Sequence, residues 1–562
     1  MTAGAPSQWR RRVAWAAIAA TLLVTAATSL WPLTRSYWYQ NHDMVAYPVR
    51  VLEYVGAWRA GAIWPRWAPD LYEGYGCAFF NFYAPGVFVI AGVPLLLGAT
   101  AATALKLAIL VFTLAGFAGI FGFVWSETRR ADAALLATLI FGVYPYHATQ
   151  LFVRGDLAEY SAGCVAPLVF WAYRALARAP AERALRVGCT AAGLHAATLL
   201  THTLTGQWVT ELLLLLVVYQ AQRAWRGGDR WRAVLFVVVF GGGCGLTSIY
   251  ALPALLERPL VHIERMTQGG LATMRNFIDA AWVTSPGFFF VGRAILLTPL
   301  VVIAACVRRR RPLAGPLVLA TVTLVLGAMM LRFAMPLWRW LPFAEYIQFP
   351  WRLLSFIGVF GALAWGVAAA ELLPQRALIA WPIVGLVALA IGWDSRRGFP
   401  DTQPPMTEAE VPASTAQIAR EWHSTVVSDE YLPRDTPKPS PRPGFFVGQS
   451  DAAVDSILRS GLGYKLDVGG EAGSTVDLHA LWYPGWQVET RSGPTAAQIG
   501  PSPRQGLVRL TLPQKGYYGL RVTFGLTPLR LVATLLSWLS LALLVASLWW
   551  LRRRLRAPLA SA

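Results

Sequence analysis

Charged residues are scarce in this chain. Asp, Glu, Lys and Arg make up only 14% of its 562 residues, whereas soluble domains contain about 25%. Hydrophobic residues make up 56%, and the mean hydropathy is +0.45. The composition therefore argues against a soluble globular protein and indicates an integral membrane protein.

Nucleotide-binding signatures are missing as well. The sequence has no G-x-G-x-x-G after an expected strand, no phosphate-binding loop and no repeat typical of solenoids or propellers. Nucleotide-dependent chemistry is therefore not expected. If the protein uses an activated substrate, we expect that substrate to arrive already attached to lipid.

Metal and disulfide motifs are equally rare. Of five cysteines, Cys77 alone is expected to be exposed, and the other four lie in or at the ends of apolar runs, so no disulfide framework is predicted. His195 and His202 lie seven positions apart, whereas zinc ligands on a helix are normally four apart, so no metal site is predicted. We expect His195 to be a buried hydrogen-bonding residue and His202 to line an outer cleft. No cofactor is predicted with certainty, and a divalent cation stays open.

The charge that is present is strongly positive, at +19. Its arginines gather in short clusters between apolar runs, at 10–12, 129–130, 174–186, 223–232, 308–311 and 552–556. This distribution is typical of cytoplasmic loops rather than of a nucleic-acid surface, so no nucleic-acid partner is expected. The N-terminus is accordingly predicted to be cytoplasmic in a multi-pass protein of the cell membrane.

Apolar runs long enough to span a membrane recur along the chain. They lie near 13–33, 103–125, 131–147, 159–178, 186–203, 206–222, 233–252, 287–307, 313–332, 351–371, 376–393 and 528–551, which gives twelve crossings. The first run is longer than a signal-peptide core, so we read it as an uncleaved helix. The run 85–98 is short and contains Pro94, and we expect it to be re-entrant; if it crosses, the count becomes thirteen.

These patterns predict a polytopic α-helical membrane protein with three parts. Residues 1–397 form the transmembrane domain, in which 34–83 is the first outer loop. Residues 398–525 contain a Pro-rich linker and alternating stretches such as "STVDLHALWYPGW" and "GLVRLTLP", which predict an extracytoplasmic β-sandwich. Residues 526–562 form a final transmembrane helix and a basic cytoplasmic tail.

His42 and Asp43 lie in the first outer loop, directly before an expected amphipathic helix. Apolar residues at 45, 49, 52 and 55 predict a helix on the membrane surface, with Arg50 and Glu53 on its other faces. Asp43 is either the N-cap of that helix or a carboxylate that accepts a proton from an acceptor. Arg66 follows in an aromatic stretch of the same loop, typical of sugar stacking or of an interfacial belt.

Other outer segments bring further polar side chains to the same face. "VRGDLAEYSAG" carries Arg154, Asp156 and Glu159, which form either a capped and snorkelling helix end or a site for a lipid phosphate. The loop 253–286 carries Arg275 and could act as a lid. "LPFAEYIQFPWRLLSF" adds Glu345, Gln348 and Arg352 at the start of a membrane helix.

A resemblance to known proteins covers nearly the whole chain. It rests on the motifs "HDM", "GAIWPRWAPDLYEGYG", "FNFYAP", "RGDLAEY", "THTLTG", "MRNF" and "IQFPWRLL", and on "WYPGW" in the sandwich. The chain resembles the bacterial membrane family labelled 6-pyruvoyl-tetrahydropterin synthase-related. That family is similar in turn to the GT-C superfamily of polyprenyl-phosphate-sugar glycosyltransferases. Pterin chemistry itself is not expected, because the histidine-liganded zinc site of the soluble enzyme is missing.

The GT-C resemblance implies inverting sugar transfer from a polyprenyl-phosphate donor to an extracytoplasmic glycan, lipid or protein acceptor. It makes Asp43 the base or acceptor-orienting residue, with Arg154 and Arg352 at the phosphate. Many relatives carry two adjacent acidic residues in this loop, whereas His42 stands beside Asp43 here.

Two other functions are compatible with the sequence: a transporter or flippase of lipid-linked glycans, and a non-catalytic scaffold with a glycan-binding β domain. Convergence of Asp43, Arg154 and Arg352 would favour the transferase, and their dispersal would favour the scaffold.

Overall fold

The computed structural model describes residues 30–39, 43–285, 287, 289–374, 377–395, 406–407, 409–411, 429–434, 436–437, 447–503 and 505–556. Most of the expected first helix, 13–29, and His42 lie outside the described residues.

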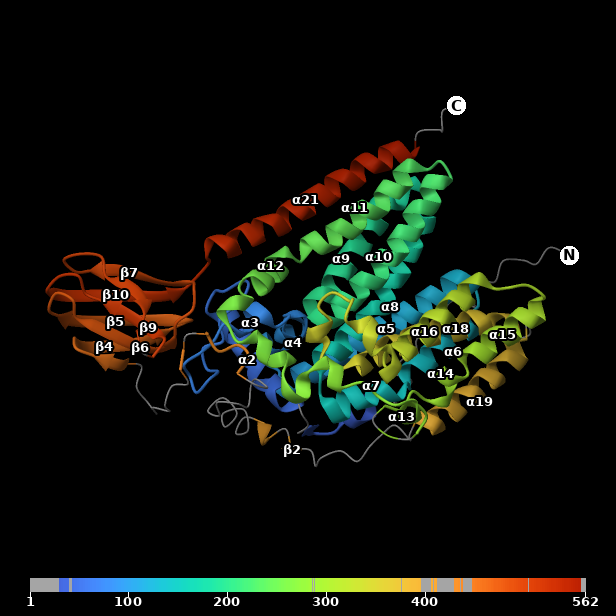
Figure 1. Ribbon diagram of the computed structural model, residues 1–562, viewed down its shortest axis with the longest axis horizontal. Coiled ribbons are helices and arrows are strands. Elements are labelled where there is room, and N and C mark those ends of the chain that lie inside the picture. Colours follow the sequence, from blue (N-terminus) through green and yellow to red (C-terminus); the bar gives the residue numbers. More distant parts are fainter. Residues whose placement is uncertain are drawn as a thin grey trace.

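Helices form the bulk of the molecule, and a β-sandwich lies at one end (Figure 1). The first half of the chain contains α2 (Tyr47–Arg59), α3 (Phe79–Phe82), α4 (Gly86–Leu96), α5 (Ala101–Thr128), α6 (Ala131–Gly142), α7 (Pro145–Thr149), α8 (Leu157–Arg178), α9 (Ala184–Thr201), α10 (Thr203–Arg226), α11 (Arg230–Leu246) and α12 (Ser248–Leu256). The second half contains α13 (Ala280–Thr284), α14 (Arg293–Leu296), α15 (Thr298–Arg309), α16 (Ala314–Met329), α17 (Met335–Trp338), α18 (Leu354–Leu372), α19 (Ala377–Ser395) and α21 (Pro528–Arg556). The predicted helical class is confirmed.

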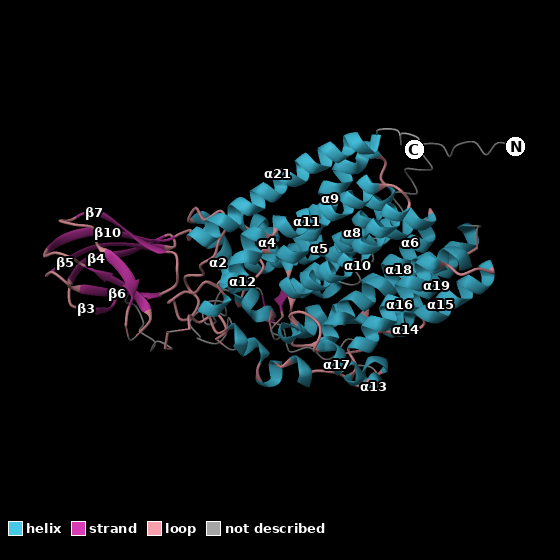
Figure 2. Cartoon of the chain, turned by 45° about the horizontal axis from the view of Figure 1, so that its top comes forward, coloured by secondary structure: helices cyan, strands magenta, loops and turns pink. Residues whose placement is uncertain are grey.

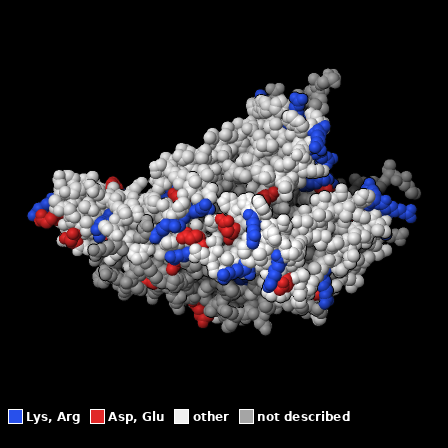
Figure 3. Space-filling model, viewed as in Figure 1, with Lys and Arg blue, Asp and Glu red and all other residues white. Residues whose placement is uncertain are grey.

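Four of the described helices are long and apolar enough to cross a membrane. They are α5, α10, the span Pro350–Leu372 that includes α18, and Pro528–Arg553 in α21; a bent pair, α11 and α12, is a fifth candidate. Figure 3 shows the surface of α21 almost free of charged side chains along most of its length, with basic side chains near its C-terminal end. This distribution is typical of a helix that passes through lipid.

Several expected spans are interrupted. The run 131–147 is split between α6 and α7, 233–252 is bent by 63° between α11 and α12, and helix α15 begins only at Thr298 in the run 287–307. Proline begins α7 and lies in the first turn of α15, where its missing N–H costs nothing. Helix α4 has 11 residues and is about 16 Å long, too short for a crossing. The count of twelve or thirteen crossings stays a prediction.

The helix after Asp43 was expected to keep Arg50 and Glu53 away from its apolar, buried face, and this prediction is wrong. Helix α2 buries Arg50 and Glu53, which are 6% and 7% exposed, whereas Leu52 is 40% exposed. The remainder of the first outer loop folds over the helix and supplies partners for both charges. Arg50 lies against the Phe79 and Tyr83 rings, and the amide of Asp70 donates to Glu53 Oε2 (3.2 Å). Helical periodicity alone could not show that this face is covered.

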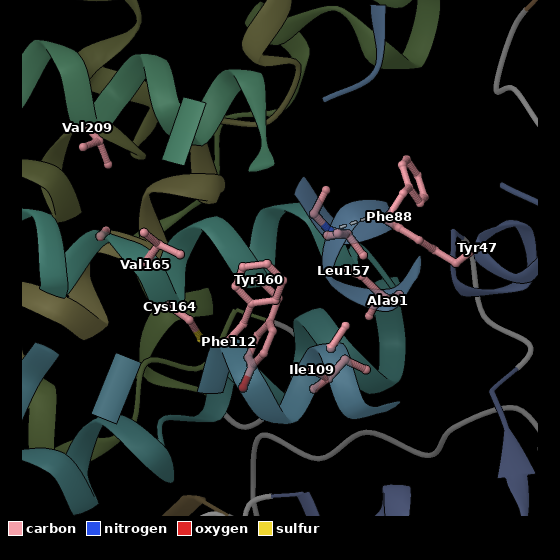
Figure 4. Close-up of a cluster of buried hydrophobic side chains, with 14 of the residues drawn as sticks. Tyr47, Phe88, Ala91, Ile109, Phe112, Leu157, Tyr160, Cys164, Val165 and Val209 are labelled. Atoms are coloured by element: carbon pink, nitrogen blue, oxygen red, sulfur yellow. Dashed lines mark hydrogen bonds between the residues drawn. The ribbon is translucent and has the colours of Figure 1, made fainter. Parts of the chain in front are cut away.

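Helices α4, α5 and α8 pack into one core with α2. Tyr47 of α2, Phe88 of α4, Ile109 of α5 and Leu157 of α8 lie in it together (Figure 4). Glycines let α5 and α8 approach closely, since a Cβ at Gly119 would lie 2.6 Å from the Leu168 backbone nitrogen. The close packing fixes the start of α8, which carries Asp156 and Glu159.

The C-terminal strands form two antiparallel sheets packed as a sandwich, as predicted (Figure 2). One sheet has the order β4-β5-β10-β7 and the other β3-β6-β9-β8. The strands are β3 (Val447–Ser450), β4 (Ala453–Ser460), β5 (Gly463–Gly470), β6 (Thr475–Leu481), β7 (Trp486–Ser492), β8 (Gln498–Pro501), β9 (Leu507–Thr511) and β10 (Gly516–Phe524). Alternate residues point inward, such as Leu466 and Val468 of β5, and α21 follows the last strand.

The sandwich is held against the first outer loop. The amide of Leu481 donates to the Tyr75 carbonyl (2.9 Å), and the Trp67 ring packs on Trp486 and Phe524. Cys77, expected to be exposed, is fully buried in this region, where its backbone pairs with that of Ala68. The expectation is wrong because the aromatic loop folds into the interface instead of lying open.

The described parts of the Pro-rich linker pack against the first outer loop. Strand β2 (Met406–Thr407) pairs with β1 (Tyr37–Trp38) of the first outer loop. Tyr431 is buried and its ring stacks on Phe82. The linker therefore ties the sandwich to the helical body.

Candidate functional site

Asp43 lies just before a 3-10 turn, η2 (Met44–Ala46), that leads into α2. Its amide donates to the Arg154 carbonyl (3.0 Å), which joins the first outer loop to the segment before α8. Its carboxyl caps no helix, contrary to the N-cap alternative, and accepts no hydrogen bond from the described part of the chain. The residue is half-buried, and the described residues leave the oxygens of its carboxyl without a hydrogen-bond donor.

The start of α8 carries the three charges singled out in the sequence. A π-helical turn, η3 (Gln150–Arg154), ends at Gly155, which has φ +69° and reverses the chain before Asp156. Asp156 caps α8 through the Glu159 amide (3.0 Å) and pairs with Arg154 Nη2 (3.3 Å). The capped helix end, one of the two alternatives, is therefore present, but its Arg154–Asp156 pair is buried rather than snorkelling, and the phosphate site stays a prediction.

Glu159 is the hub of a buried hydrogen-bond network. Its Oε2 pairs with Arg154 (2.9 Å) and Arg352 (3.2 Å). Its Oε1 accepts hydrogen bonds from Tyr146 (3.2 Å), Gln150 (3.0 Å) and Ser355 (3.4 Å). With its oxygens occupied in this way, Glu159 holds the two arginines in place.

Arg352 lies in η11 (Pro350–Leu353), at the start of the α18 span. Besides Glu159 it lies 4.0 Å from Asp156 Oδ2, and its Nη2 donates to Gln348 Oε1 (3.2 Å). Gln348 has φ +62°, a strained value for a residue other than glycine, and donates from Nε2 to the Met266 carbonyl (3.0 Å). Nη1 of Arg352 makes no hydrogen bond within the described ranges, so it can donate to an anion.

Arg50 belongs to the same site, although the sequence placed it on an outward face. Its guanidinium lies over the rings of Tyr47 (5.4 Å), Phe79 (5.1 Å) and Tyr83 (5.0 Å). The hydroxyls of Tyr47 and Tyr83 are 2.9 Å apart, and Tyr47 accepts from the Ala158 amide of α8 (2.9 Å). An arginine within an otherwise apolar stretch was the only signal for this role.

We call Asp43, Arg50, Arg154, Asp156, Glu159 and Arg352 the Asp43 cluster. Burial raises the pKa of Asp43 above its usual value, the Asp156 carboxylate raises it further, and Arg50, Arg154 and Arg352 oppose the shift. Burial also acts to raise the pKa of Asp156, but His202, Arg154 and Arg352 outweigh it and hold that pKa well below the usual range. The two carboxyls thus differ in proton affinity, as an acid–base site requires.

His202 connects α9 and α10 at the edge of the cluster. Its Nδ1 accepts from the Thr205 amide (3.3 Å) and lies 2.8 Å from the Thr205 hydroxyl. It is half-buried and close enough to Asp156 for their charges to interact, and its place in an outer cleft stays a prediction. His195 is fully buried and bonds to Thr210 (2.8 Å), as predicted.

Three expected site residues lie away from the Asp43 cluster. Arg66 donates to Asn81 Oδ1 (2.8 Å) and to the Ile249 carbonyl (2.7 Å), in a second buried network around Glu257. Burial, with Arg530 nearby, lowers the pKa of Arg66 to about 10. Arg275 and Glu345 are exposed, and their side chains make no hydrogen bond or ion pair in the described ranges.

Within the described residues, no group of three or more His, Cys, Asp or Glu side chains is placed to hold a metal ion. Asp43 and Asp156 instead lie among three arginines, which supply their counter-charges. The described residues of the site therefore do not fit a divalent cation.

The chain matches no protein-family model, so its resemblance to the 6-pyruvoyl-tetrahydropterin synthase-related family is not supported. No curated protein matches it either.

The solved structures to which the chain is similar include those of three proteins. Arabinofuranosyltransferase AftD from Mycobacteria is 19% identical over 67% of this chain and 27% of that chain, with a TM-score of 0.40. The apo oligosaccharyltransferase of Archaeoglobus fulgidus is 11% identical over 69% of this chain and 56% of that chain, with a TM-score of 0.38. ArnT from Cupriavidus metallidurans bound to undecaprenyl phosphate is 14% identical over 75% of this chain and 78% of that chain, with a TM-score of 0.36. The chain thus spans about a quarter of the length of AftD and about half that of the oligosaccharyltransferase.

Proposed function

We propose that this chain is an integral-membrane glycosyltransferase that transfers a sugar from a polyprenyl-phosphate donor to an extracytoplasmic acceptor. The observation that carries the proposal is the Asp43 carboxyl, which accepts no hydrogen bond from the described residues and lies beside three arginines and a second carboxylate. A carboxylate serves an attacking hydroxyl, and arginines serve a departing phosphate. The GT-C-like motifs of the sequence agree with this assignment.

In the proposed reaction, an acceptor hydroxyl attacks the anomeric carbon of the donor from the side opposite the phosphate. A carbon–oxygen bond to the acceptor forms, and the bond to the phosphate oxygen breaks, so that the lipid phosphate leaves with the electron pair. Asp43 takes the hydroxyl proton, and the configuration at the anomeric carbon is inverted. Arg352, through its available Nη1, and Arg154 stabilise the charge on the departing phosphate.

The remaining members of the Asp43 cluster act through these groups. Glu159 holds Arg154 and Arg352 at fixed positions, and Gln348 orients Arg352. Asp156 keeps a negative charge near Asp43 and so raises its basicity. Arg50 opposes that effect and keeps Asp43 from remaining permanently protonated.

The convergence of Asp43, Arg154 and Arg352 supports a transferase rather than a scaffold, because a scaffold needs no buried arginines beside a carboxyl that lacks a hydrogen-bond donor. We further propose that the Asp43 end of the helices and the β-sandwich are extracytoplasmic, because the described arginine clusters, at 129–130, 174–186, 223–232, 308–311 and the end of α21, lie at the opposite helix ends. Membrane lipids and a polyprenyl-phosphate-linked sugar are then the partners.

Deletion of the gene tests the proposal in cells. We expect lipid-linked sugars, measured by mass spectrometry, to accumulate, and a surface glycan to be lost. A wild-type copy should restore both, and Asp43→Asn should restore neither. The matched control is Asp279→Asn, which removes an exposed carboxylate 3.2 Å from Arg332 and should restore both. Restoration by Asp43→Asn would exclude Asp43 as the base, and unchanged glycans and lipids after deletion would contradict the transferase.

A further inference from the structure

A short segment between α16 and the α18 span exposes an unusual number of large apolar side chains. It comprises η9 (Arg332–Ala334), α17 and the residues up to Phe343, and we call it the 332–343 segment. Trp340 is 87% exposed, Phe333 70%, Leu337 61% and Phe343 47%. Ala334 and Trp338, on the opposite face, are each 1% exposed. The segment therefore has one face packed on the protein and one apolar face without a cover.

The buried face is firmly tied to two apolar helices. Trp338 Nε1 donates to the Met329 carbonyl at the end of α16 (2.8 Å), and its ring lies 5.7 Å from that of Trp208 in α10. Gln207 Nε2 of α10 donates to the Pro342 carbonyl (3.0 Å). These contacts fix the direction of the exposed face.

Helices α10 and α16, to which the segment is tied, also expose apolar side chains. In α10, Leu215 is 69% exposed, and in α16, Val318 is 61% and Leu324 56% exposed. Helices α10 and α16 are both strongly apolar. A surface of this kind is stable in lipid and costly in water, at about 25 cal/mol per Å² of apolar area.

The ends of the segment have the chemistry of a membrane–water boundary. Trp340 is of the residue type enriched there, because its ring is apolar and its N–H is polar. Arg339 is exposed beside the apolar residues and can reach lipid phosphates, and Arg332, also exposed, lies 3.2 Å from Asp279. A membrane accounts together for the exposed apolar side chains of the segment and for those of α10 and α16, whereas a protein partner on the segment alone would not.

We propose that the 332–343 segment is a membrane-surface anchor, whose Phe333, Leu337, Trp340 and Phe343 side chains enter the lipid boundary at the end of the bundle that carries Asp43. The segment leads directly into Gln348 and Arg352, so its insertion sets the depth of Arg352 at the level of lipid headgroups. The inference does not depend on sugar transfer, and its test needs no substrate.

The test compares two leucines of similar exposure. Leu337 is 61% exposed in the segment, and Leu458 is 64% exposed on β4 of the sandwich. Leu337→Cys and Leu458→Cys are made in the full chain, with Cys189, Cys244 and Cys306 replaced by alanine, and each is spin-labelled. The proteins are reconstituted into vesicles of phosphatidylethanolamine and phosphatidylglycerol. Relaxation of each label by oxygen, which concentrates in lipid, is compared with relaxation by a water-soluble nickel chelate.

We expect oxygen to relax the label at 337 more strongly than the nickel chelate does, and the reverse at 458. A label at 337 that behaves like the label at 458 would place the segment in water and overturn the proposal. A label at 337 reached by neither agent would mean that protein, such as a second copy of the chain, covers the face, and this also overturns it. A second variant, Trp340→Ser, should leave the protein folded, since the side chain is outside the core, and should reduce the oxygen accessibility at 337.

Discussion

The buried network around Glu257 joins four parts of the chain and allows a quantitative prediction. Glu257, at the end of α12, accepts from Arg530 of α21 at both oxygens (3.0 and 2.9 Å), from Asn81 of the first outer loop (2.7 Å) and from Tyr483 of the sandwich (3.1 Å). Glu257 is 4% exposed and Arg530 is fully buried. The network should therefore hold the sandwich and α21 against the outer loop.

Glu257→Gln keeps the side-chain volume and removes the charge. Arg530 then remains buried without its carboxylate, near Arg66, which is also buried. Loss of one partner of a buried ion pair costs about 3–5 kcal/mol. We expect the docked state of the sandwich to lose stability of this order.

Hydrogen–deuterium exchange of the Leu481 amide, which donates to the Tyr75 carbonyl across the interface, measures this loss. Exchange through local opening should accelerate about a hundredfold to a few thousandfold, at 1.36 kcal/mol per factor of ten. Glu471→Gln is the control, because its exposed pair with Lys515 should contribute little and leave the rate unchanged. Wild-type exchange at Leu481 in the Glu257→Gln protein would refute the role of the network.

Three further predictions follow from the site and its supports. Glu159→Gln leaves the buried Arg154 and Arg352 without their shared carboxylate, so the free energy of unfolding, measured by thermal unfolding, should fall by about 3–5 kcal/mol. The control Glu489→Gln removes an exposed carboxylate 4.0 Å from Arg521 and should unfold like the wild type. Equal unfolding of the two variants would contradict the network. If Asp43 acts ionised, the rate of sugar transfer should rise with pH through the raised pKa of Asp43, so the acid limb of the pH–rate profile should lie above the usual pKa of Asp, about 3.9. Arg50→Gln removes a positive charge that opposes this shift and should move the acid limb to higher pH. The exposed Arg59→Gln is the control, and an acid limb at the same pH in both variants would exclude this role of Arg50. Gly86→Ala would place a Cβ 2.8 Å from the Thr201 Cα and should destabilise the protein by about 1–3 kcal/mol in thermal unfolding. Gly193→Ala, whose Cβ meets nothing within 4 Å, should leave the stability unchanged. Wild-type stability of Gly86→Ala would show that α4 does not pack closely against the end of α9.

The sequence predicts what depends on local pattern. The apolar runs predict the helices, alternation in stretches such as "STVDLHALWYPGW" predicts the sandwich, and Asp156 before an apolar run predicts a helix cap. Each of these features is set by neighbours a few positions away along the chain.

The partners of charged side chains depend instead on tertiary contacts. Arg50 reads as an outward residue of a surface helix until Phe79 and Tyr83 are seen folded over it. Arg66 follows Asp43 in the same loop, yet its neighbours are Glu257 and Arg530, brought by α12 and α21. Asp43 has His42 beside it in the sequence, and its acidic neighbour, Asp156, comes from the start of α8.

The most direct test of the proposed function is sugar transfer by the purified chain in vesicles that contain undecaprenyl-phosphate-linked sugars. The wild-type protein should release undecaprenyl phosphate from at least one such donor. Asp43→Asn should lower the rate by about 10²–10⁴, the usual contribution of a general base, while the binding of undecaprenyl phosphate itself is retained. Transfer at the wild-type rate by Asp43→Asn would contradict the assignment of Asp43 as the base.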